Sequence, residues 1–180
     1  MRIAIDMDEV MADAVKKIRQ QYLKEFHVWL SEEALAGKRF QEAVPMAHAL
    51  EIKKWLHRHG FFRDFEVMKG CQSVIKTWVN DGHEVFVTTA AMEFRNCFED
   101  KYDWLAEHFP FIGWQQIVFC GNKKILNADI LIDDNAHNFE HFIGQGVLFT
   151  AHHNLSETRY PRVGNWSELQ DFVTEFITKK

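Results

Sequence analysis

The sequence predicts an α/β fold: a doubly wound, Rossmann-like parallel sheet with a small helical cap insertion. Along the 180 residues, short apolar runs alternate with segments of helical spacing, which is the order of right-handed β-α-β units. The apolar runs are continuous rather than alternating, as expected for strands that are covered on both faces. One stretch near the N-terminus breaks this rhythm and shows helical spacing alone.

Five brief strands are expected, each followed by a polar or acidic cluster. They are centred on residues 3–5, 85–87, 117–119, 130–132 and 147–149. Helices with an apolar stripe are expected over residues 15–26, 74–79, 94–109 and 169–177. The last helix is expected to begin after Ser167, with Gln170 completing a capping box.

The stretch from 27 to 69 is interpreted as the insertion, and residues 1–26 and 70–180 as the core. Within the insertion, the pattern predicts a helix over 47–59 that ends at Gly60, and no strand. We expect the insertion to cover the carboxyl edge of the sheet, where ligands bind in open α/β folds.

Composition excludes several classes of partner. A net charge of −5 and a pI near 6.0 leave no broad basic surface, so neither a polymeric nucleic acid nor an anionic membrane is an expected partner. Acids arrive at Asp6 before any apolar stretch long enough for a signal peptide or a membrane span, and a cytoplasmic protein is expected. Cys71, Cys97 and Cys120 are widely spaced and are expected to be reduced and buried. The sequence leaves open whether the chain forms a homo-oligomer.

The residues that directly follow the strands carry the chemistry. These are Asp6 and Asp8 after the first strand, Thr88 and Thr89 after the second, Lys123 after the third, and Asp133 and Asp134 after the fourth. Clustered carboxylates repel one another, and a hard, oxygen-ligated cation such as Mg²⁺ relieves that repulsion and bridges to a phosphate. The sequence therefore predicts a Mg²⁺-dependent reaction on a small phosphate ester.

Each group has a role in that chemistry. Asp6, nearest the strand, is placed to attack phosphorus, and Asp8 can protonate the leaving oxygen and later accept a proton from water. Thr88 and Lys123 would hold the non-bridging phosphate oxygens. Lys124 adjoins Lys123, so which lysine turns inward is open from spacing alone.

The segments Asp6–Val10, Val87–Thr89, Lys123 and Ile132–Asp134 resemble, in order, the four motifs of the haloacid dehalogenase superfamily. A closer resemblance is to the 5'(3')-deoxyribonucleotidases, carried by Asp6–Asp13, Asp100–Trp104 and Ala128–Asp134. The resemblance implies hydrolysis of nucleoside monophosphates through an aspartyl phosphate.

The same resemblance assigns further residues. Lys101 would be a second phosphate contact. Asp134 would be the direct metal ligand with Asp133 supporting it, and the Asp8 backbone carbonyl would complete the protein's share of the metal sphere. Phe40 is the best candidate for an aromatic contact to the ligand.

Two positions depart from the family pattern: Glu9 stands where the family usually has Gly, and Ala14 where members carry an aromatic residue. A phosphatase acting on another small phosphate ester is therefore an alternative, and so is a non-catalytic phosphometabolite-binding regulatory module. At the level of residues, an exposed helix lysine paired with acids is the alternative for Lys101. His152 and His153 are adjacent but lack a third metal ligand at suitable spacing, and are interpreted as surface or packing residues.

Overall fold

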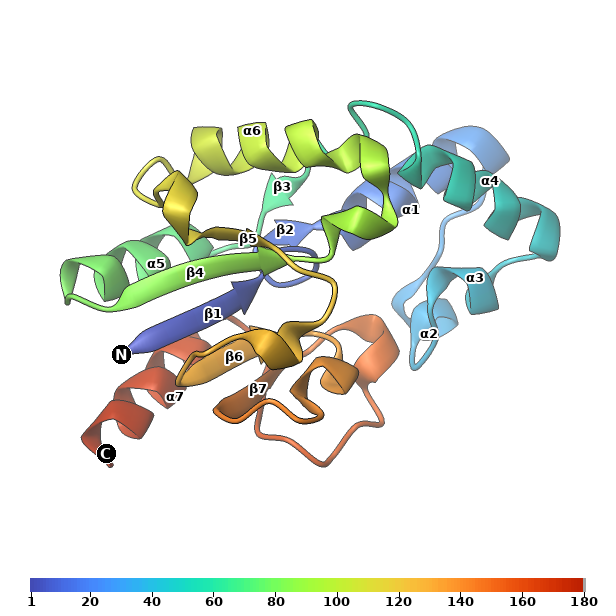
Figure 1. The fold of residues 1–180 in the computed structure, drawn as a ribbon. Helices are drawn as coiled ribbons and strands as arrows, with labels where there is room; N and C mark the ends of the chain where they lie inside the picture. The colour runs from blue at the N-terminus through green and yellow to red at the C-terminus, as the bar shows by residue number, and fades with distance from the viewer. Residues whose placement is uncertain (180) are drawn as a thin grey trace.

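The computed structural model describes residues 1–179, and its centre is a six-stranded sheet in which every neighbouring pair is parallel (Figure 1). The strand order is β5-β4-β1-β6-β7-β8. Their bounds are β1 (Arg2–Asp6), β4 (Glu84–Thr89), β5 (Ile117–Phe119), β6 (Ile130–Asp133), β7 (Gln145–Phe149) and β8 (Arg162–Val163). The α/β fold and the five expected strands are confirmed, and β8 is added at the edge.

The strand order reverses at β1, because the chain places β4 and β5 on one side of it and β6, β7 and β8 on the other. Such a reversal opens a crevice beyond the carboxyl ends of the two central strands, where ligands bind in open α/β sheets. β1 and β6 are paired in parallel from Ile3 to Ile5, so their carboxyl ends lie side by side. Asp6 and Asp133 are the last residues of these two strands.

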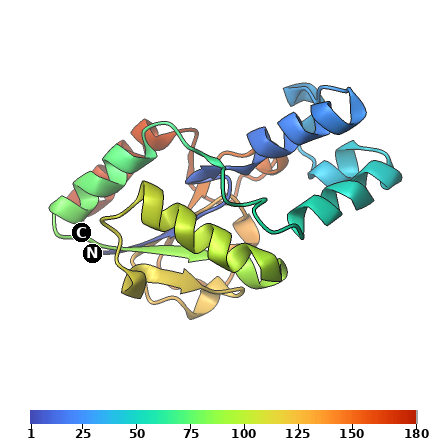
Figure 2. The same cartoon turned by 90° about the horizontal axis from the view of Figure 1, so that it is seen from above.

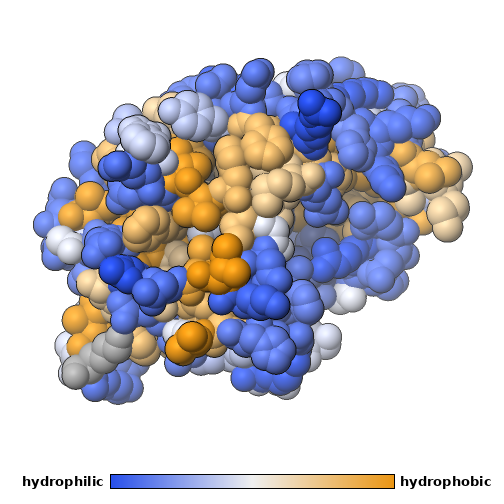
Figure 3. All heavy atoms as spheres, viewed as in Figure 1, coloured by the Kyte–Doolittle hydropathy of each residue, from blue (hydrophilic) through white to orange (hydrophobic). Residues whose placement is uncertain are grey.

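The main core lies on one face of the sheet. Ile3, Ile5 and their strand neighbours pack there in one cluster with residues of α5 (Cys71–Asn80), α6 (Phe98–His108) and α7 (Trp166–Thr178). Figure 2 shows α5 and α7 side by side on one side of the sheet. Ala4, Leu131 and Leu148 point to the other face, where a smaller cluster forms with the short 3₁₀ turn η5 (Ala136–Phe139). Figure 3, viewed as in Figure 1, shows hydrophobic residues gathered at the middle of this face of the molecule.

Within the insertion, three helices are present: α2 (Glu32–Leu35), α3 (Phe40–Ala43) and α4 (Met46–Leu56). Together with α1 (Ala14–Phe26) they lie beyond the carboxyl end of β1, on the right in Figure 1. The assignment of 27–69 as the insertion stays a prediction.

The helix expected over 47–59 is present as α4, which ends at Leu56 rather than at His59. The expectation of no strand was wrong: β3 (Glu66–Val67) pairs antiparallel with β2 (Ala12–Asp13). A two-residue strand whose partner lies far away in sequence leaves no local periodicity to read.

The expected capping box at Ser167 was also wrong. The α7 helix begins at Trp166, and the Asn165 side chain accepts hydrogen bonds from the backbone N–H groups of Ser167 and Glu168, both at 3.0 Å. This cap is local, and the buried Trp166 indole adds a tertiary contact by donating to the Val10 carbonyl at 2.8 Å. The segment expected as a helix from residue 94 forms a 3₁₀ turn first and becomes α6 at Phe98.

The three cysteines are buried and unpaired, as expected. Within residues 1–179, no helix has the length and apolarity that a membrane crossing requires.

Candidate active site

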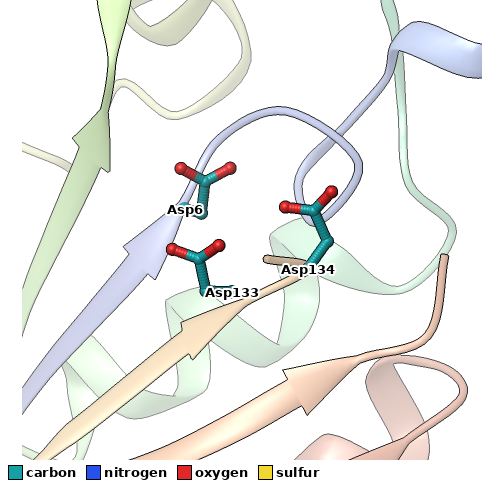
Figure 4. A group of neighbouring side chains, drawn as sticks. All are labelled: Asp6, Asp133 and Asp134. Carbon is teal, nitrogen blue, oxygen red and sulfur yellow. The ribbon is translucent and has the colours of Figure 1, made fainter. Parts of the chain in front are cut away.

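Three carboxylates meet where β1 and β6 end. Asp6 closes β1, Asp133 closes β6, and Asp134 follows directly; each offers one carboxylate oxygen within 4.8 Å of the others. Figure 4 shows the three side chains gathered beside the loop that follows β1. The strand reversal thus brings together acids that are more than a hundred residues apart in the chain.

Lys123 is the cation of this cluster. It lies in the 3₁₀ turn η4 (Lys123–Ile125) after β5, is buried, and forms ion pairs with Asp6 and, at 2.5 Å, with Asp133. Its neighbour Lys124 is exposed, so Lys123 is the lysine that turns inward. One cation for three carboxylates leaves the cluster with excess negative charge.

The electrostatics of the site follow from that excess. Burial raises the pKa of Asp6 to about 7, even though Lys123 opposes the shift, and Asp133 and Asp8 add to it. Burial and the adjacent Asp133 also hold the pKa of Asp134 well above its usual range. Burial alone would lower the pKa of Lys123, but the charges of Asp6 and Asp133 raise it above the ordinary value. Two carboxyls that resist ionisation in the protein alone would be stabilised as anions by a bound cation.

The donor set fits a hard divalent cation such as Mg²⁺, which prefers oxygen ligands. Asp133 is already engaged: its Oδ1 accepts from the Asn135 N–H at 2.9 Å and its Oδ2 accepts from Lys123. Asn138 donates to both Asp133 oxygens, at 3.0 and 2.9 Å. Within residues 1–179, Asp134 has no comparable side-chain partner: His153 Nε2 lies 3.5 Å from its Oδ2, and burial lowers the pKa of His153 to about 4, so that ring is neutral near pH 7. Asp6 and Asp134 therefore have the freer oxygens.

Asp8 is held by a second lysine. Lys101, on α6, forms an ion pair with Asp8 Oδ2 and donates to the Thr89 hydroxyl at 2.8 Å. Lys101 is only 1% exposed, so it is not an ordinary solvent-exposed lysine on a helix surface. The other Asp8 oxygen, Oδ1, is buried and has no hydrogen-bond partner within the described chain.

The role of Thr88 as a phosphate contact stays a prediction. Thr88 is fully buried, and its hydroxyl donates to the Ile5 carbonyl of β1 at 3.4 Å. Of the two threonines, Thr89 is the one joined to the charged residues, through Lys101.

A cavity of about 210 Å³ adjoins the acids. Phe40 lines it, as do Asp8 and Asp134, so one space reaches from the carboxylates to the insertion. The rest of the lining is mixed. Its apolar part is Ala14, Val15, Ile18, Ile52, Leu56, Phe62 and Phe94, and its polar part is Glu9, Arg39, Gln41, Glu93, His152 and His153.

The sequence family described as "5' nucleotidase, deoxy (Pyrimidine), cytosolic type C protein" matches residues 1–180. The chain belongs to this family. We refer to it below as the type C deoxynucleotidase family. The resemblance to the haloacid dehalogenase superfamily and its 5'(3')-deoxyribonucleotidases is thereby confirmed.

Relatives within the type C deoxynucleotidase family are similar over nearly their whole length. A putative 5'(3')-deoxyribonucleotidase of Staphylococcus epidermidis is 40% identical over 171 residues, covering 95% of this chain and 94% of that protein. The 5'(3')-deoxyribonucleotidase of Bacillus subtilis is 37% identical over 177 residues, covering 93% and 95%. Among solved structures, a HAD family hydrolase from Deinococcus radiodurans with bound phosphate and sodium has a TM-score of 0.65 at 15% identity, covering 97% and 95%, which shows the shared fold.

Glu9 marks where this member of the type C deoxynucleotidase family departs from the expected glycine. Its backbone has φ 61°, a left-handed conformation that glycine adopts without strain. The Glu9 carboxyl accepts a hydrogen bond from the Val15 N–H at 2.7 Å, in the first turn of α1. Burial raises the pKa of Glu9 to about 8. The Glu9 carboxyl thus pairs with one of the backbone N–H groups that have no intrahelical partner at the start of α1.

Three residues at the site were missed by the sequence reasoning or assigned to packing. His152 and His153 line the cavity, and Asn154 donates to the Asp134 carbonyl at 2.7 Å and to the Phe149 carbonyl at 2.8 Å. All three form the 3₁₀ turn η6 (His152–Asn154), shortly after β7. The position after the fifth expected strand was the available signal, because it reaches the same sheet edge as the other motifs.

Proposed function

We propose that this chain is a Mg²⁺-dependent phosphomonoester hydrolase that dephosphorylates nucleoside monophosphates, as a 5'(3')-deoxyribonucleotidase. The observation that carries the proposal is the cluster of Asp6, Asp133 and Asp134 around Lys123, opening on a cavity with aromatic walls. Membership of the type C deoxynucleotidase family and the names of the relatives support the same reaction.

In the proposed reaction, an Asp6 carboxylate oxygen attacks phosphorus and forms an aspartyl phosphate. The bond from phosphorus to the ester oxygen breaks, and that oxygen takes a proton from Asp8. Asp8 then accepts a proton from the water that attacks the aspartyl phosphate, which releases inorganic phosphate and restores Asp6. The contact with Lys101 fixes Asp8 in place for both transfers.

The chain's cations would hold the phosphate. Lys123 follows β5 and Lys101 lies on α6. Each forms an ion pair with a proposed catalytic acid, Lys123 with Asp6 and Lys101 with Asp8. Thr88 and Thr89, at the carboxyl end of β4, are proposed as further phosphate contacts. When bound, Mg²⁺ would neutralise the carboxylates and the phosphate charge that develops during transfer.

The free oxygens of Asp6 and Asp134, with the Asp8 backbone carbonyl, are proposed as the protein's metal ligands. Asp133 is proposed as a supporting residue, because hydrogen bonds and Lys123 already engage both of its oxygens. Phe40 is proposed to line the nucleoside-binding part of the site, because it lines the same cavity as Asp8 and Asp134. We further propose a cytoplasmic enzyme that acts on free nucleotides and on no polymeric nucleic acid.

The test is phosphate release by the purified protein from deoxynucleoside and ribonucleoside monophosphates and from sugar phosphates, each with Mg²⁺ and with a chelator. We expect hydrolysis of nucleotides with Mg²⁺ and none with the chelator. A preference for sugar phosphates would overturn nucleotides as the substrate but would leave the proposed phosphatase reaction in place. Tight nucleotide binding with no release under any condition would indicate a regulatory module instead.

A further inference from the structure

His152 lines the cavity beside Phe40. The two rings lie with centroids 5.1 Å apart, and the His152 carbonyl accepts a hydrogen bond from the Gly37 N–H at 2.7 Å. The residue thus belongs to the core through η6 and contacts the insertion through both its ring and its backbone. His152 and Phe40 therefore form adjoining parts of the cavity wall.

Both ring nitrogens of His152 are buried, and neither has a hydrogen-bond partner in the described chain. Buried polar groups are nearly always paired in folded proteins, and an unpaired one is destabilising. Burial also lowers the pKa of His152, so its ring is neutral near pH 7 and carries one donor and one acceptor. The ring holds two unused hydrogen-bonding positions beside a ligand-sized space.

The ring can present these positions to a ligand without breaking an existing bond. The terminal side-chain torsion of a histidine is broad and roughly two-fold, and turning the ring about it exchanges ring nitrogens with ring carbons. Because no protein group holds either nitrogen, the free energy of turning the ring toward the cavity includes no lost hydrogen bond. Other polar side chains also line the cavity, Arg39 and Gln41 among them. His152 differs from them in packing against the Phe40 ring and in having two buried nitrogens without a partner among residues 1–179.

We propose that His152 is a specificity-determining residue that hydrogen-bonds the polar edge of the nucleobase while the base packs against Phe40. The inference rests on the proposed function. It goes further by assigning recognition of the nucleobase to the side of the cavity next to the insertion. An apolar pocket alone discriminates weakly between leaving groups, whereas a site with a hydrogen-bonding group rejects ligands that lack the partner much more strongly.

The experiment compares two substrates that share the reacting phosphate but differ in the base: thymidine 5'-monophosphate and 2-deoxyribose 5-phosphate. Each is assayed with the wild type, His152→Phe, which fills the space without a hydrogen bond, and His152→Gln, which keeps a donor and an acceptor. We expect His152→Phe to lower kcat/KM for the nucleotide by roughly tenfold or more, and for the sugar phosphate by no more than about twofold. His152→Gln should restore most of the nucleotide preference.

The readout is the ratio of the two kcat/KM values within each protein, so a smaller folded fraction in one variant cancels. An unchanged ratio in His152→Phe overturns this inference while the proposed function stands. A ratio lost equally in His152→Gln and His152→Phe overturns it too, because a packing role would then explain the result. If the wild type hydrolyses no nucleotide, the proposed function fails and the inference fails with it.

Discussion

Glu9 adjoins the proposed acid Asp8 and combines two opposing effects at a single residue. Its left-handed backbone is unfavourable for a residue with a Cβ atom by about 1–2 kcal/mol, whereas glycine adopts it freely. Its carboxyl compensates by accepting from the first turn of α1, a capping contact worth about 0.5–2 kcal/mol. The two terms are similar in size, so the chain tolerates Glu9 at a position whose backbone favours glycine.

The two effects can be separated by two substitutions. Glu9→Ala and Glu9→Gly both remove the capping carboxyl, but only glycine relieves the left-handed backbone. We therefore expect Glu9→Gly to be more stable than Glu9→Ala by about 1 kcal/mol in urea unfolding of the metal-free protein. Equal stabilities would show that the backbone at Glu9 is not strained.

At the scale of elements, η6 supports the metal-facing side of the site. Asn154 donates to the carbonyls of Asp134 and Phe149, and its own Oδ1 accepts from the Ala151 N–H at 3.1 Å and from Arg162 at 2.8 Å. Because one buried side chain joins the residue after β6 to the end of β7 and to β8, it fixes where Asp134 lies.

We predict that Asn154→Ala is destabilised by about 2–4 kcal/mol, since several buried partners lose their hydrogen bonds together. Asn80→Ala is the matched control, because Asn80 is exposed at the end of α5, and its effect should stay within about 0.5 kcal/mol. Urea unfolding measures both. A loss in Asn154→Ala no larger than in the control would refute the supporting role of this turn.

The sequence anticipates elements whose signal is local. Continuous apolar runs such as 130–132 mark the central strands, and the polar residues directly after them mark the site edge. The start of α7 was misplaced although its cap, Asn165, is a local signal. Elements that depend on distant partners were missed altogether, as with β3, whose partner is β2. Periodicity carries no information about such long-range pairings.

The same distinction holds within the site. Asp6 and Asp133 could be placed from strand ends, because parallel strands share one edge. The burial of Lys101 depends on how α6 packs on the sheet, and the orientation of the Thr88 hydroxyl depends on its neighbour in β1. Neither property is written in the spacing of those residues along the chain.

At the scale of the whole molecule, cation binding should stabilise the fold in a pH-dependent way. The pKa of Asp6 is raised to about 7 from an ordinary 3.8, so the metal-free fold binds a proton that the unfolded chain releases. This contribution to stability is complete below an ordinary aspartate pKa and is lost as pH rises through about 7. Protons and Mg²⁺ compete for the same oxygens, so Mg²⁺ should stabilise the protein more at high pH.

We predict a small rise in Tm on adding Mg²⁺ near pH 5 and a larger one near pH 8. At about a hundredfold excess over Kd, the gain at the higher pH should approach roughly 3 kcal/mol, or about 5–10 °C for a domain of this size. Differential scanning calorimetry with Mg²⁺ and with a chelator measures the difference. The rise should disappear in Asp134→Asn; a rise that is independent of pH, or that survives this substitution, would contradict the account.

The central claim is that Asp6 is the nucleophile at a carboxylate cluster shared by β1 and β6. Its most direct test is the turnover of Asp6→Asn with Mg²⁺ and the best nucleotide substrate, beside Asp64→Asn, which changes an exposed aspartate on the insertion side in the same way. We expect Asp6→Asn to remain folded and to lose at least about a thousandfold in kcat, while Asp64→Asn keeps wild-type turnover. A folded Asp6→Asn protein whose kcat stays within about tenfold of the wild type would contradict the claim.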